Sequence, residues 1–316
     1  MGTRIFFASD IHGSEACFRK FLNAIKIYKV DVAILGGDLT GKLLIPIIRV
    51  REMHYEADFA GRKWVIKKEE ELRRLLKLIR DSGYYPRIID EDEYYRLKSD
   101  ESLVKKLFNE VMSEVMREWI RIAEEKLKDI NAECYIMPGN DDSRVIDDIL
   151  NESKRIINPD ERVLEIKGGF EMLSLGASNP TPWRTPREYT EEEIENKLMS
   201  LLSHIKNLET AIFNIHVPPY GTLIDMAPLL DDNFRVVTKG GRIVFVHVGS
   251  KAVRYVIEKS QPLVSLHGHI HESKGVDKIG RTFCFNPGSE YSEGFLRGII
   301  INLEERRVKN YLFTYG

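Results

Sequence analysis

Residues 4–12, RIFFASDIH, give the first indication of the fold, because an apolar run of strand type ends there in Asp10 and His12. The same order recurs in VAILGGD, residues 32–38, where an apolar run ends in Asp38. Runs that are apolar throughout, rather than alternating, are typical of strands buried on both faces. The two stretches therefore predict buried strands whose carboxyl ends carry polar side chains.

Similar runs, separated by helical spacing, recur along the chain. The further strand-type runs that end in Gly, Asp, Asn or His are Cys134–Met137, Ala211–Ile215, Ile243–Val246, Leu263–Leu266 and Thr282–Phe285. Helical periods include the face of Cys17, Phe21, Leu22 and Ile25, and a helix from Ile194 to Ile205 that a Thr190–Glu193 capping box begins. This alternation predicts an α/β fold, a four-layer αββα sandwich of two mixed β-sheets. The tail from Gly294 to Tyr315 predicts two final strands around a polar Glu304–Arg307 turn.

Residues 44–130 interrupt this alternation of strands and helices. Residues 48–66 predict a hairpin that turns at Ala60-Gly61-Arg62, and residues 68–82 and 101–130 show helical spacing. We therefore expect one domain, residues 1–316, that carries a mainly helical insertion at 44–130. The apolar stripes of its helices must be buried against something, so we expect a lid over a cleft or an oligomerisation element that joins copies of the chain.

Composition limits the classes of protein. The 316 residues include 47 Lys and Arg and 49 Asp and Glu, so the net charge is −2. This overall charge gives no electrostatic reason to expect binding to nucleic acid or to acidic membranes. A local basic patch could still bind nucleic acid, and no membrane partner is expected. Three separate cysteines, without a CxxC pair or a signal-type start, favour a reducing, cytoplasmic location.

Side chains able to bind metal follow the predicted strands. They are Asp10, His12, Asp38, Asn140, His216, His269 and His271. Each alone has an ordinary explanation as a turn or a core residue, but loops at the carboxyl ends of strands are where α/β folds place ligand sites. Seven nitrogen and oxygen ligands in such loops predict a metal centre. Mixed oxygen and imidazole ligands suit Mn, Fe, Ni, Co or Zn.

The set of motifs resembles the calcineurin-like metallophosphoesterase superfamily. The matching residues are Asp10-Ile11-His12, Gly37-Asp38, Gly139-Asn140-Asp141, His216, Gly268-His269-Ile270-His271 and Asn286-Pro287-Gly288-Ser289. The resemblance implies two divalent metal ions that share Asp38. The first ion would take Asp10, His12, Asp38 and His271, and the second Asp38, Asn140, His216 and His269. A hydroxide held between the ions would attack phosphorus in line, with Asp38, Asn140 and Asp141 as the catalytic residues.

Asp141 departs from the pattern, because most members of the superfamily carry a histidine after the Gly-Asn pair. An ionised Asp141 beside two cations cannot donate a proton at neutral pH. Three explanations are open: the leaving group needs little acid help, a water supplies the proton, or Asp141 caps a helix beginning near Ser143. The helix cap is the interpretation we favour.

Four further residues are candidates for substrate binding: Lys42, Arg184, Arg187 and His247. The expected function is hydrolysis of a phosphodiester or nucleotide-like phosphate, a small phosphorylated substrate. The protein-phosphatase branch of the superfamily carries other motifs around its Gly-Asp and Gly-Asn pairs. The alternatives are a nuclease acting on single-stranded nucleic acid and a non-catalytic metal-binding interaction module that uses the insertion.

Overall fold

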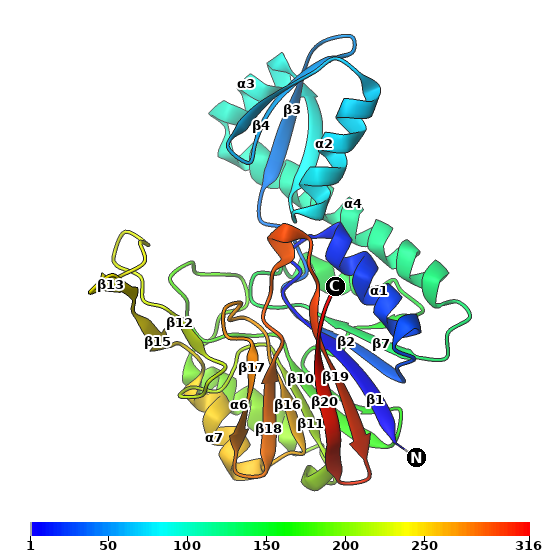
Figure 1. Cartoon of the computed structure of the whole chain (residues 1–316), viewed down its shortest axis with the longest axis vertical. Helices are drawn as coiled ribbons and strands as arrows, with labels where there is room; N and C mark the ends of the chain where they lie inside the picture. The colour runs from blue at the N-terminus through cyan, green and yellow to red at the C-terminus, as the bar shows by residue number, and fades with distance from the viewer. Residues whose placement is uncertain (1) are drawn as a thin grey trace.

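The computed structural model describes residues 2–316, and two six-stranded sheets form its body (Figure 1). The first sheet has the order β20 (Arg307–Tyr315), β19 (Arg297–Glu304), β1 (Thr3–Ala8), β2 (Val32–Gly36), β7 (Glu133–Met137) and β8 (Ile156–Ile157). The second has the order β17 (Gly275–Ile279), β18 (Thr282–Asn286), β16 (Val264–Leu266), β11 (Ile212–Ile215), β10 (Phe170–Leu175) and β9 (Arg162–Ile166).

Both sheets are mixed, and each contains a run of four parallel strands. These are β1, β2, β7 and β8 in the first sheet and β10, β11, β16 and β18 in the second. The strands β19, β20, β9 and β17 pair antiparallel at the margins. The carboxyl ends of the parallel strands therefore gather at one end of each sheet.

The body has four layers. In β1 the side chains alternate: Phe6 packs in a cluster with helices α1 (Glu15–Ile27), α4 (Glu101–Leu127) and α5 (Val145–Asn151), whereas Phe7 packs between the sheets. Helices α6 (Glu191–Leu202) and α7 (Lys251–Ser260) cover the outer face of the second sheet. The predicted αββα sandwich of two mixed sheets is confirmed. The capping box of Thr190 and Glu193 at the start of α6 is confirmed as well.

The segment after β2 carries a smaller sheet of its own. Its order is β5 (Arg62–Ile66), β4 (His54–Phe59), β3 (Leu44–Arg51) and β6 (Tyr85–Asp90), and helix α2 (Glu69–Asp81) packs on a separate apolar core with it. The predicted turn at Ala60-Gly61 forms, with Ala60 at φ 53° and Gly61 at φ 69°, but the hairpin spans residues 54–66, and residues 48–51 belong to β3, a third strand that pairs with β4. The sequence did not predict β6, the parallel partner of β3, or helix α3 (Glu91–Ser99).

The long helix α4 begins beside this smaller sheet and continues over the first sheet of the body (Figure 1). Trp119, which is 3% exposed, stacks on Phe18 of α1 with ring centroids 4.3 Å apart. Met116, Ile120 and other residues of its second half lie in the same apolar cluster. The second half of α4 is therefore part of the body's core.

One predicted strand takes a different form. Residues 243–246, expected to be a buried strand, lie in a protruding arm that contains β12 (Met226–Pro228), β13 (Thr238–Lys239), β14 (Arg242–Ile243) and β15 (Phe245–His247). Phe245 is 46% exposed there, because β15 pairs only with the short strand β12. An apolar run of four residues thus does not by itself indicate burial.

Cys17, Cys134 and Cys284 are free and buried. Within residues 2–316 there is no helix long and apolar enough to cross a membrane.

Candidate metal centre

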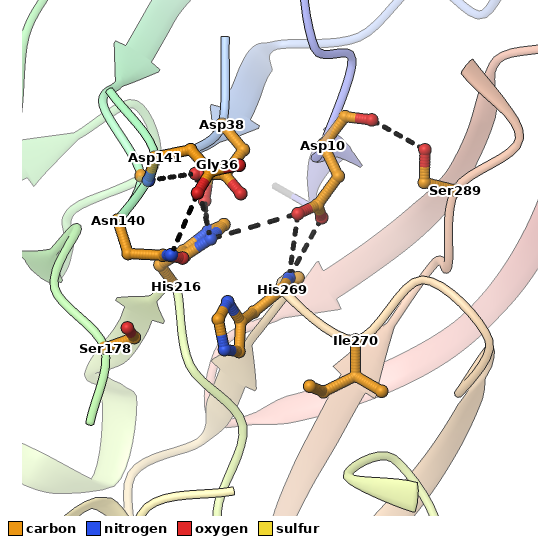
Figure 2. A network of polar contacts seen from close by, with 12 residues as sticks. Asp10, Gly36, Asp38, Asn140, Asp141, Ser178, His216, His269, Ile270 and Ser289 are labelled. Atoms are coloured by element: carbon orange, nitrogen blue, oxygen red, sulfur yellow. Dashed lines mark hydrogen bonds and ion pairs between the residues drawn. The ribbon is translucent and has the colours of Figure 1, made fainter. Parts of the chain in front are cut away.

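The seven predicted ligand side chains meet where parallel strands of both sheets end. Asp10 and His12 follow β1, Asp38 follows β2, Asn140 follows β7, His216 follows β11, and His269 and His271 follow β16. Figure 2 shows Asp10, Asp38, Asn140, His216 and His269 pointing toward one another from these loops. Residues from all parts of the body are thus brought into one cluster, in which His269 and His271 are partly exposed and the others are buried.

The first group of potential ligands is Asp10, His12 and His271. Their ligand atoms all lie within 4.8 Å of one another. The Nε2 atoms of His12 and His271 are 3.0 Å apart, and His271 Nε2 lies 3.5 Å from Asp10 Oδ1. One ion could contact all three side chains.

The second group is Asp38, His216 and His269, again within 4.8 Å of one another. Asp38 lies between the two groups, because its Oδ1 is 3.4 Å from His216 Nε2 and its Oδ2 is 3.5 Å from His12 Nε2. Each carboxylate oxygen of Asp38 thus faces a different imidazole. This is the position that a bridging ligand requires.

The chemistry of the donor atoms fits a cation. His216 Nδ1 lies 2.8 Å from the Gly36 carbonyl oxygen, which can only accept, so Nδ1 carries a proton and Nε2 is the nitrogen that faces the other ligands and can bind a cation. That Nε2 is buried without a partner, and so is Oδ1 of Asn140, whose amide nitrogen donates to Thr185 Oγ1 at 2.8 Å. Buried polar atoms without partners cost stability, and a cation would satisfy both.

The backbone around these ligands adopts a conformation that L-residues rarely take. Asp10, His12, Asp38 and His269 have φ values of 57°, 38°, 52° and 66°. Two backbone hydrogen bonds hold Asp10, His12 and Asp38 in place. The amide of Asp10 donates to the Gly37 carbonyl oxygen at 3.0 Å, and the amide of His12 donates to the Asp38 carbonyl oxygen at 2.9 Å. Such conformations cost about 1–3 kcal/mol each and concentrate at functional sites.

Burial and neighbouring charges shift the pKa values of the potential ligands. Burial raises the pKa of Asp38 above its usual value, and the nearby Asp141 and Asp10 charges act in the same direction. Burial and the neighbouring His216 lower the pKa of His269 to about 3, so its imidazole is neutral. Burial lowers the pKa of His216, but the Asp38 and Asp10 carboxylates outweigh it and raise that pKa to about 10, so this imidazole carries positive charge that a bound cation would replace.

Asp142, which no sequence motif indicated, holds the loops that carry Asp38 and Asn140 together. It is fully buried, and its carboxylate accepts hydrogen bonds from the backbone amides of Leu39, Thr40 and Gly139 and from the Thr40 hydroxyl, at 2.6–3.2 Å. In the sequence, this role could be suspected only because Asp142 is the second aspartate of GNDD, residues 139–142. A single aspartate has no characteristic spacing to the residues that it contacts.

We expect Asp142→Ala to destabilise the protein and to weaken metal binding. The change leaves several buried donors unpaired, at about 1–3 kcal/mol each, so the free energy of unfolding should fall by about 2–5 kcal/mol. Urea denaturation and metal titration measure the two effects. Asp148→Ala on α5, an exposed position, is the matched control. Normal stability in Asp142→Ala would contradict the positioning role.

The favoured interpretation of Asp141 as a helix cap is wrong. Helix α5 begins at Val145, its N-cap is Arg144, and no side chain makes the capping bond. The Asp141 carboxylate instead accepts from Lys42 Nζ at 2.8 Å, lies 3.7 Å from His12 Nδ1, and forms with His12 and Asp38 a third group that could hold a metal. Asp141 therefore faces the candidate metal centre.

The candidates for substrate binding have different positions. Lys42 lies beside the centre through Asp141, and Arg184 is exposed in the turn next to Thr185, the partner of Asn140. His247 lies in the arm, 2.7 Å from the buried Asp225. His247 thus belongs to a separate polar pair.

Arg187, a predicted substrate-binding residue, has a structural position instead. It is 2% exposed, and its guanidinium pairs with Asp147 at 2.6 Å and Asp160 at 3.1 Å and donates to the Asp142 and Ser143 carbonyls. Because every nitrogen has a protein partner, Arg187 holds the loop after β7 and has no free face to clamp a phosphate.

Comparison with known proteins finds a relative in sequence. No model of a known protein family matches the chain. The uncharacterized protein MJ1162 of Methanocaldococcus jannaschii is 39% identical over 167 residues, which cover 52% of this chain and 68% of that protein. A relative of this identity and coverage shares the family.

Solved structures show likeness in fold. The protein TT1561 of Thermus thermophilus is 15% identical, with a TM-score of 0.54 over 100% of this chain and 99% of that one. YfcE, a phosphoesterase from E. coli, is 12% identical over 98% of each chain, with a TM-score of 0.33. The first likeness shows a shared fold alone, and the second is too weak to carry an argument about function.

Proposed function

The chain belongs to the family of the uncharacterized protein MJ1162, and from the geometry of its site we propose that it is a metal-dependent phosphoesterase. The observation that carries the proposal is Asp38, whose two oxygens face His216 and His12 in adjacent groups of potential ligands. We propose two divalent ions, of Mn, Fe, Ni, Co or Zn. Asp10, His12, Asp38 and His271 would hold one, and Asp38, Asn140, His216 and His269 the other.

The proposed substrate is a phosphodiester or nucleotide-like phosphate. Divalent ions bound at the centre would neutralise the phosphoryl oxygens and lower the pKa of water. The protein would supply orientation: the left-handed backbone at Asp10 and Asp38 aims both carboxylates into the cluster, and the bond to Gly36 fixes the ring of His216. Lys42, 2.8 Å from Asp141 Oδ2, places an ammonium beside the centre that can offset the charge of a phosphate.

The direct test is metal content together with hydrolysis of bis-(p-nitrophenyl) phosphate, an activated diester whose leaving group needs no acid. We expect bound divalent metal, hydrolysis that is lost on chelation, and recovery when Mn²⁺ is added back. The other interpretations predict different results: a nuclease should degrade single-stranded nucleic acid faster than the small diester. Metal binding without hydrolysis of either substrate would favour the interaction module.

Asp141→His should supply the acid that most members of the superfamily carry. If protonation of the leaving group limits the reaction, the variant should speed cleavage of diesters with alkyl leaving groups by up to about 10²-fold and change p-nitrophenolate release little. Rates on the paired substrates measure this selectivity. A change of equal size on both substrates would contradict the acid explanation and indicate that the Lys42–Asp141 pair acts in another way.

A cytoplasmic location is also part of the proposal, supported by three free cysteines placed too far apart in the sequence to suggest a disulfide framework.

A further inference from the structure

A cavity of about 770 Å³ lies between the smaller sheet and helices α3 and α4. Its apolar lining includes Leu44, Pro46, Ile89, Leu97, Leu107 and Phe108. Sites of about 300–1,000 Å³ with mostly apolar walls and a few polar groups are typical of small-molecule binding. The cavity is therefore large enough for an organic group of substantial size.

The cavity adjoins the metal centre through Lys42. This residue lines the cavity, and its Nζ is 2.8 Å from Asp141 Oδ2. The backbone amide of Asp141 in turn donates to Asp38 Oδ1 at 3.0 Å. A molecule whose phosphate is held at Asp38 could pass Lys42 and place its remaining part in the cavity.

The charge around the cavity favours an anionic ligand. Three lysines line it together with a single acid, Glu101; Lys42 is paired with Asp141, and Lys98 and Lys105 supply the remaining positive charge. The lysine side chains are exposed, so they keep their hydration while they attract an anion. Apolar walls with a positive rim match a molecule that has a large apolar part and a phosphate.

We propose that this cavity binds the non-scissile substituent of the substrate, and that this substituent is a large apolar or aromatic group on a phosphodiester. The inference rests on the proposed function, because it assumes that the phosphate binds at Asp38. In the hydrolysis, the oxygen of water forms the new bond to phosphorus, the bond to the leaving alcohol breaks, and the apolar substituent stays on the phosphate product.

The test uses two diesters that share one leaving group. In methyl p-nitrophenyl phosphate and 2-naphthylmethyl p-nitrophenyl phosphate both retained groups are alkyl esters, the released product is p-nitrophenolate, and only the size of the retained substituent differs. We expect kcat/KM to be at least about 10-fold higher for the naphthyl diester, in line with the discrimination of apolar pockets. Binding of 2-naphthylmethylphosphonate and methylphosphonate, followed by calorimetry, measures the same preference without turnover.

Two neighbouring positions on α4 give a matched pair of variants. Val104 lines the cavity and is 39% exposed, whereas Leu103 is 41% exposed and lies outside the lining. Val104→Trp should fill the cavity and lower the naphthyl-to-methyl preference at least about 10-fold, and Leu103→Trp should leave it unchanged. Both positions are exposed on a helix, so both variants should fold.

The outcomes separate the inference from the proposed function. If the methyl diester is hydrolysed but the naphthyl group brings no preference, or if both tryptophan variants change the preference equally, the cavity assignment is overturned and the proposed function stands. If neither diester is hydrolysed by metal-loaded protein, the proposed function fails. The calorimetric preference of the wild type and of Val104→Trp then still decides whether the cavity binds the apolar group.

Discussion

Asp38→Asn is expected to remove nearly all hydrolysis, by about 10³-fold or more, and at least one bound metal ion. Asp38 is 3% exposed, and its two oxygens lie 3.4 and 3.5 Å from imidazole nitrogens of separate groups. Two dications about 4 Å apart repel each other strongly unless an anion lies between them. An amide keeps the shape of the side chain and removes that charge.

The measurement is metal content per chain, followed by kcat/KM for bis-(p-nitrophenyl) phosphate. Asp58→Asn, an exposed position on β4, is the matched control and should behave as wild type. If Asp38→Asn retained two bound ions and normal turnover, the bridging assignment would be refuted. The loss should be larger than that from Lys42→Gln, because Lys42 contacts the centre only through Asp141.

The body and its ligand cluster could be predicted because both depend on local signals. Apolar runs such as residues 4–9 and 32–35 form strands of parallel sets, so the polar residues that follow them meet at one end. Asp142 could not be predicted in the same way. Its role depends on the backbone amides of Leu39 and Thr40, which are distant in sequence and come near only when the sheet forms.

The insertion was harder to predict, because its sheet combines distant segments. Strand β3 pairs in parallel with β6, from Leu44 opposite Tyr85 to Arg49 opposite Asp90. Parallel pairing across α2 leaves no turn signal between the two strands. Pro86 also weakens the strand pattern of β6, although as an edge strand it can accept a proline. The hairpin of β4 and β5 was predicted, because its turn is local.

The structure also changes how the insertion should be divided from the body. We propose that residues 44–100 form the insertion and that α4 belongs with the body, since Trp119 stacks on Phe18 at 4.3 Å and Ala123 and Leu127 are fully buried. The insertion is also tied to the ligand loops through the start of β6. The Gly41 amide donates to the Tyr85 hydroxyl at 2.8 Å, and a Cβ on Gly41 would lie 2.4 Å from Gly83 O.

Replacing residues 44–130 with a Gly-Ser linker should therefore prevent folding of the body, although every proposed ligand lies outside the cut. Removal of α4 exposes the apolar face of α1 and the first sheet, and loss of Trp119 alone should cost about 3–5 kcal/mol, a large part of a typical stability of about 5–15 kcal/mol. Soluble yield, circular dichroism and thermal unfolding measure the result.

Tyr85→Phe gives the finer comparison, because it removes only the hydroxyl that accepts the hydrogen bond from the Gly41 amide. It should fold, lose about 1 kcal/mol of stability and bind metal more weakly. A soluble, folded truncation that still binds metal would show that α4 belongs to a separable insertion, and that the contacts at Trp119 and Gly41 do not support the metal centre.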